Sequence, residues 1–178
     1  MTIGLEIANA LDPFRLPESW LLAVYNRNFT VALQPWHFLI RAAHVLGACV
    51  FFGAVMIVNL RLLGRAAELK LSSIFELASP LVYGSLAVTM VTGLALFFYD
   101  PVAVGSHDWF TLKLLFITLG FMDAAWLNAW GKAGRLTVNG KLVWPGKVAA
   151  VTALILWGLT ILCSCLNAEP PPRLYLGS

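Results

Sequence analysis

Three histidines are the residues of this sequence best suited to hold a metal or a cofactor: His37, His44 and His107. The first two lie in an apolar stretch that begins at Trp36, and His107 lies two residues before Trp109, where another apolar stretch begins. Imidazoles on two helices can ligate a haem iron from opposite faces in the core of a helix bundle. We therefore treat all three as candidate metal ligands, with haem b as the expected cofactor.

Helical geometry limits which of these side chains can share one iron. At about 1.5 Å of rise per residue, His44 lies about 10.5 Å deeper than His37 on the same helix, so one iron cannot bind both. His37 and His107 are expected at the same level, which favours them as a pair. His44 pairs with His107 only if the preceding loop folds inward, or with the thioether of Met90, which is expected at matching depth.

Two cations are expected about one turn inside the same membrane boundary, Arg41 and Lys113. A cation at that depth needs an anionic partner or must extend its side chain towards the surface. Haem propionates would supply the partner, and the carboxylates of Asp100 and Asp108 are the alternative. Both residues are therefore candidate cofactor-binding residues.

The composition indicates a membrane protein. The chain of 178 residues is 60% hydrophobic and only 12% charged, with a mean hydropathy of +0.80, whereas about 25% of the residues in a soluble domain are charged. The lipid bilayer is therefore an expected partner. The net charge of +3 is spread without a block of like charges, which gives no indication of a nucleic-acid partner.

Four apolar stretches are long enough to cross a bilayer. They cover residues 36–62, about 80–99, about 109–130 and about 147–167. Short loops between them predict antiparallel neighbours, and so an all-α, up-down four-helix transmembrane bundle over residues 36–168.

The two ends of the chain are expected outside the cytoplasm. Residues 1–35 are predicted to be a tail carrying an interfacial amphipathic helix over Trp20–Leu33, and residues 169–178 a C-terminal tail. Seven of the twelve Lys and Arg residues fall in the first and third loops, counted with the helix ends that flank them, and the positive-inside rule places these loops in the cytoplasm. In a bacterial inner membrane both termini would then be periplasmic.

Short motifs carry a resemblance to a known group. They are His44-Val-Leu-Gly47, Asn59-Leu-Arg61-Leu-Leu-Gly64, Thr92-Gly93-Leu-Ala-Leu-Phe97 and Phe110-Thr-Leu-Lys113-Leu-Leu. Over about residues 36–130 the chain resembles an uncharacterised bacterial family of small four-helix integral-membrane proteins, which is itself similar to the copper-resistance protein D and b-type cytochrome group.

The resemblance implies that His44 is the membrane histidine and that Lys113 is the polar residue of the third span. It also implies a membrane cytochrome or a metal-handling subunit. Members of the family tend to have a histidine near the inner end of the third helix, where this chain has Asn128-Ala-Trp130. The outer half of the bundle is therefore the remaining haem candidate.

Three functions remain open from the sequence. The first is a haem-b electron-transfer subunit near the outer face, exchanging electrons with membrane quinone or a periplasmic redox protein. The second is a copper-handling membrane protein, and the third is a cofactor-free anchor or assembly subunit of a larger complex. An electron-transfer or anchor subunit is expected rather than a stand-alone enzyme.

Overall fold

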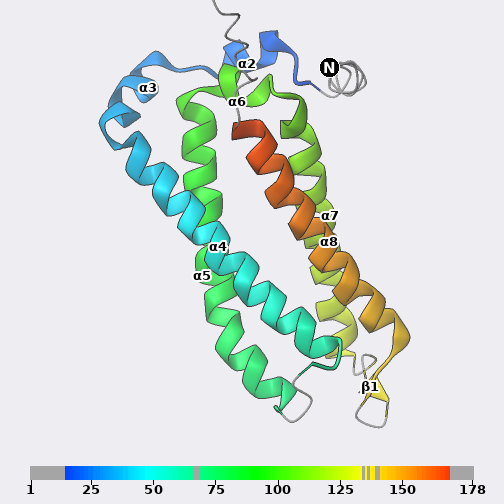
Figure 1. Ribbon diagram of the computed structural model, residues 1–178. Coiled ribbons are helices and arrows are strands. Elements are labelled where there is room, and N and C mark those ends of the chain that lie inside the picture. The colour runs from blue at the N-terminus through cyan, green and yellow to red at the C-terminus, as the bar shows by residue number, and fades with distance from the viewer. Residues whose placement is uncertain (1–14, 66–68, 134, 136, 139–140, 169–178) are drawn as a thin grey trace, which may run out of the picture.

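The protein is a bundle of four long helices that run alternately up and down (Figure 1). The computed structural model describes residues 15–65, 69–133, 135, 137–138 and 141–168, so the predicted C-terminal tail and the first fourteen residues lie outside the described residues. The long helices are α4 (His37–Leu62), α5 (Leu71–Tyr99), α7 (Asp108–Lys132) and α8 (Trp144–Ala168).

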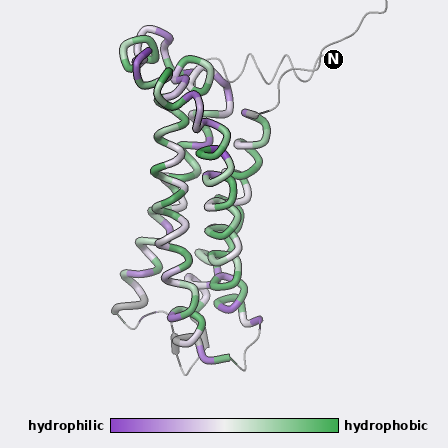
Figure 2. Tube along the Cα trace, turned by 90° about the vertical axis from the view of Figure 1, so that its left-hand side faces the viewer, coloured by the Kyte–Doolittle hydropathy of each residue, from purple (hydrophilic) through white to green (hydrophobic). Residues whose placement is uncertain are grey.

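Each of these helices belongs to a segment long and apolar enough to cross a membrane. The segments are Arg27–Leu62, Ser73–Tyr99, Asp108–Trp130 and Trp144–Asn167. Figure 2 shows hydrophobic residues along the middle of the helices and more hydrophilic ones towards the ends of the bundle. The predicted fold class, an all-α bundle with four candidate membrane spans, is confirmed.

The bundle consists of two antiparallel hairpins. α4 packs closely on α5 and α7 on α8, and the hairpins join where α4 meets α8, whereas α5 and α7 make few close contacts. Trp157 of α8 forms the centre, with its ring centroid 4.6 Å from that of Phe51 on α4 and 5.7 Å from that of Phe121 on α7. Gly120 leaves room for the indole, because a Cβ there would lie 3.0 Å from it.

One end of the bundle is covered by short helices and is called the capped end below. They are α2 (Glu18–Val24), α3 (Arg27–Leu33), the 3₁₀ turn η2 (Gln34–Trp36) and α6 (Pro101–Gly105). Figure 1 shows them together at the top, with the small hairpin of β1 (Thr137–Val138) and β2 (Lys141–Leu142) at the opposite end. Leu21 of α2, only 2% exposed, packs against Gly105 of α6.

The prediction of one helix over Trp20–Leu33 was wrong, because the chain breaks at Asn26. Asn26 has extended backbone angles, and its side-chain oxygen accepts hydrogen bonds from the backbone N–H groups of Asn28 and Phe29. Asparagine is among the best residues for capping a helix N-terminus in this way. The segment therefore forms α2 and α3.

The second long helix also begins earlier than predicted. α5 starts at Leu71, and Pro80 lies inside it and not near its first turn. A proline inside a helix lacks the N–H for one backbone hydrogen bond and crowds the carbonyl of the preceding turn, but helices that pack in membranes tolerate both effects. By contrast, α4 ends with a Schellman motif, in which Gly64 has φ +94° and the N–H of Arg65 bonds to the carbonyl of Leu60.

Gly47 lets α4 approach α5 closely. A Cβ at this position would lie 2.7 Å from the Oγ1 of Thr89 and 3.3 Å from the carbonyl oxygen of Ser85. Small residues at helix interfaces allow such backbone approach in membrane proteins. The contact therefore fixes the distance between the two helices of the first hairpin.

We expect Gly47→Ala to lower the free energy of unfolding by about 1 to 3 kcal/mol, the usual cost of overpacking a tight contact. Thermal unfolding of the purified chain in detergent measures this. Gly53→Ala, on the same helix, is the matched control, because nothing lies within 4 Å of a Cβ there. Equal unfolding temperatures for the two variants would contradict the proposed role of Gly47.

Candidate functional site

His44 is the histidine that the structure places inside the bundle with defined partners. Its side chain extends from α4 to α5, where Nδ1 lies 3.0 Å from the carbonyl oxygen of Thr89 and 3.2 Å from the Oγ1 of Thr92. The Thr92 hydroxyl itself donates to the carbonyl of Val88 at 2.6 Å. Nδ1 therefore faces two oxygens that act as acceptors.

This arrangement decides the tautomer of the imidazole. A carbonyl oxygen can only accept, so Nδ1 must carry the proton and donate it. In a neutral ring Nε2 then holds a free electron pair, and it makes no hydrogen bond to any described residue. A histidine whose Nδ1–H is held by a backbone carbonyl is the usual form of a histidine that ligates a metal through Nε2.

Gly93 is what gives the imidazole access to the Thr89 carbonyl. It lies one turn beyond Thr89 on the same face of α5, and a helical Cβ leans back over the preceding turn. A Cβ at Gly93 would lie only 2.9 Å from the Cε1 of His44. Thr89, Thr92 and Gly93 therefore form the binding surface on α5 for the imidazole ring of His44.

Two more polar groups lie at the same depth. Counted from the capped ends of their helices, His44, Lys113 of α7 and Cys163 of α8 are all about 8 to 11 Å deep. Lys113 is close enough for its charge to act on both the His44 ring and the Cys163 thiol. We call His44, Thr89, Thr92, Lys113 and Cys163 the His44 layer.

Lys113 has no carboxylate partner among the described residues. Its ammonium lies 5.9 Å from the centroid of the Phe110 ring, a cation–π contact. Asp108, one of the two expected partners, pairs with Arg15, and Asp100 caps α6 by accepting from the N–H of Ala103. Neither carboxylate neutralises Lys113.

The other predicted ligands lie elsewhere. His37 stacks on Tyr99 of α5, with ring centroids 4.4 Å apart, and His107 lies in the turn before α7. Both are at the capped end, but no ring contact or hydrogen bond joins them in the part of the chain that is described. Met90 is 43% exposed, and Arg41 is exposed on α4.

No protein-family model matches the chain, and neither curated proteins nor solved structures gave a match. The resemblance to the copper-resistance protein D and b-type cytochrome group therefore stays a prediction.

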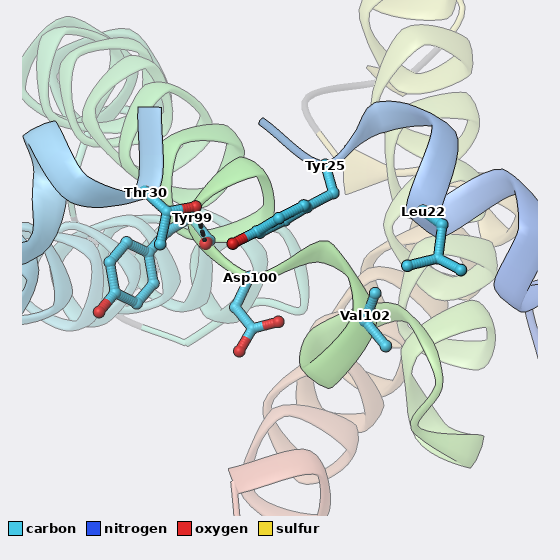
Figure 3. Close-up of a pocket in the computed structure, with 6 residues that line it drawn as sticks. All are labelled: Leu22, Tyr25, Thr30, Tyr99, Asp100 and Val102. Carbon is cyan, nitrogen blue, oxygen red and sulfur yellow. Dashed lines mark hydrogen bonds between the residues drawn. The ribbon is translucent and has the colours of Figure 1, made fainter. Parts of the chain in front are cut away.

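A separate pocket lies at the capped end. It has a volume of about 320 Å³ and is lined by Leu22, Tyr25, Thr30, Tyr99, Asp100 and Val102. Figure 3 shows Tyr25 extending into it between the Leu22 and Val102 flank and the Asp100 and Thr30 flank, with Thr30 bonded to the backbone oxygen of Tyr99. We call it the capped-end pocket.

Sequence reasoning missed the partners of His44 and the whole capped-end pocket. Thr89 and Gly93 look like packing residues in the sequence, although the spacing of 89, 92 and 93 puts three small residues on one helical face. That spacing, matched to a histidine at equal depth, was the available signal. No sequence pattern indicated the capped-end pocket, because the pocket depends on how α2 and α3 fold over α6.

We expect His44 to be protonated on Nδ1 and bare on Nε2 in the purified, cofactor-free protein. Nitrogen-15 NMR of histidine-labelled protein in detergent distinguishes the two tautomers, and a His44→Gln variant assigns the signal. Gly93→Ala should disturb this signal because it displaces the ring, whereas Gly84→Ala, with nothing within 4 Å of its Cβ, should not. A proton on Nε2 would contradict the observed hydrogen bonding.

Proposed function

We propose that the protein is a membrane-embedded electron-transfer subunit that binds haem b through the Nε2 of His44. The observation that carries the proposal is the hydrogen bond from His44 Nδ1 to the Thr89 carbonyl, which leaves Nε2 as a free donor to a metal. When bound, the haem would supply one-electron chemistry at its iron. The chain's own part is to orient the His44 imidazole and, through the hydrogen bond to Thr89, to make Nε2 a stronger ligand for the iron.

The residues around His44 fit a haem better than a bare metal ion. Among the residues that the structure describes, no group of three or more His, Cys, Asp or Glu side chains is placed to hold a metal together. A porphyrin brings four nitrogen ligands and needs only axial ligands from the protein. A single well-oriented imidazole is therefore a more complete site for haem than for a free ion.

Lys113 supports the same proposal through charge. A cation inside an apolar bundle is costly without an anion, and this one lacks a carboxylate partner among the described residues. A haem propionate would match it. Arg41, exposed and three residues before His44, would serve a propionate nearer the surface or reach the lipid headgroups.

His44 is preferred to the pair of His37 and His107 on the same evidence. The His37 ring is stacked on Tyr99, and no donor or acceptor among the described residues fixes one of its nitrogens for ligation. His107 belongs to a turn and not to a long helix. A ligand on rigid elements holds a cofactor more closely than one on a turn.

Membrane orientation determines the partners of such a subunit. The capped end would face the periplasm of a bacterial inner membrane, because the Lys- and Arg-rich connections lie at the opposite end. The His44 layer would then lie in the outer half of the bilayer. Membrane quinone and a periplasmic redox protein are the proposed electron partners.

Copper handling is a second candidate, favoured by one observation. Cys163 is 3% exposed and carries a free thiol in the His44 layer, and a thiol with an imidazole is a donor set that copper(I) accepts. Purified protein with stoichiometric copper and no haem would support this function. Colourless, metal-free protein would support an anchor or assembly subunit.

The purified protein is expected to be red, with a Soret band, and His44→Ala should remove that band. Circular dichroism and gel filtration must show that the variant keeps its helices and its size. His37→Ala and His107→Ala are matched controls and should keep the band. The opposite pattern, loss in these two variants and retention in His44→Ala, would refute His44 as the ligand.

A periplasmic reporter fused after Ser178 should be active, because an even number of spans places both termini on the same side as the capped end. Alkaline phosphatase, which folds only when exported, measures this directly. A cytoplasmic reporter fused at the same position is the control and should be inactive. Activity of that control would invert the proposed orientation.

A further inference from the structure

The capped-end pocket has the chemistry of a cation site. Among the described residues that line it, Asp100 is the one acidic side chain, and its Oδ1 accepts a hydrogen bond from the N–H of Ala103. The second carboxylate oxygen has no partner among the described residues. Tyr25 adds an aromatic ring, whose face attracts cations.

The end of α5 adds negative potential at the same place. α5 is 29 residues long and ends at Tyr99, with no basic residue in its last turn. The final carbonyls of a helix lack intrahelical partners and carry the negative end of its dipole. Thr30 donates to the Tyr99 carbonyl at 2.9 Å, which leaves that oxygen one further lone pair.

The pocket also has an apolar side and lies at a membrane boundary. Leu22 and Val102 form one flank, as Figure 3 shows. The apolar segment of α5 ends at Tyr99, so the pocket begins where that segment stops. A volume of about 320 Å³ is at the small end of ligand pockets and suits a headgroup-sized molecule.

We propose that the capped-end pocket binds a primary ammonium group, as carried by the ethanolamine headgroup of a membrane lipid. The three N–H donors of such a group match the free oxygen of Asp100 and the remaining lone pair of the Tyr99 carbonyl. A quaternary choline headgroup has no N–H to donate, and a single aromatic ring is a poor substitute for a cage. This site does not depend on a cofactor in the His44 layer.

Calorimetric titration of the full chain in a non-ionic detergent tests the proposal. Dihexanoyl phosphatidylethanolamine should bind saturably at one site, about tenfold or more tighter than dihexanoyl phosphatidylcholine, since hydrogen bonds to a charged group are lost with choline. Equal affinity for the two lipids, or no saturable binding of either, would overturn it. Free ethanolamine binding as tightly as the lipid would support the ammonium site and assign a soluble amine as its ligand.

Two carboxylate variants separate charge from folding. Asp100→Asn should weaken phosphatidylethanolamine binding about tenfold or more while preserving the fold, because asparagine caps a helix as well as aspartate does. Asp108→Asn removes a carboxylate at the same end that is engaged by Arg15, and should leave binding unchanged. Unchanged binding in Asp100→Asn, or equal losses in both variants, would overturn the assignment.

Two tyrosine variants test the aromatic contribution in the same titration. Tyr25→Phe keeps the ring and should bind like the parent chain, whereas Tyr25→Leu should bind several-fold more weakly. Full affinity in Tyr25→Leu would contradict a cation held against the ring.

Discussion

The hydrogen bond between His44 and the carbonyl of Thr89 is the contact around which the first hairpin is arranged. It requires α4 and α5 to approach closely, which Gly47 allows, and it requires an uncovered carbonyl, which Gly93 provides. In an apolar bundle the Nδ1–H group of His44 would be costly without an acceptor, so the bond to Thr89 favours one relative rotation of the two helices. The close contact at Gly47 and the hydrogen bond of His44 therefore favour the same relative position of α4 and α5.

The remaining polar groups of the bundle are distributed in relation to this contact. Lys113 and Cys163 reach the same depth from the second hairpin, so the layer draws on all four long helices. Above it, α2, α3 and α6 cover the helix ends and use Asn26 and Asp100 as caps. These short helices lie over the capped end of the bundle, and α2, α3 and α6 border the capped-end pocket.

The sequence was sufficient for the four long helices because length and uniform hydropathy define a membrane span without reference to its neighbours. It was insufficient for the capped end, where one side chain, Asn26, decides between one helix and two. It indicated that His44 and Lys113 are polar residues within apolar stretches, but it did not indicate which residues surround them. Helices that are apolar around their whole circumference give little indication of which face turns inwards, so Thr89 and Gly93 could not be matched to His44 in advance.

The pairing of α4 with α5 has a consequence for the order of assembly. Chains are synthesised from the N-terminus, and early segments can associate before later ones exist. His44, Thr89 and Gly93 all precede the turn at His107, whereas Lys113 and Cys163 follow it. The ribosome therefore makes His44 and its partners on α5 before it makes Lys113 and Cys163, so the first hairpin can orient the imidazole before the second hairpin packs against it.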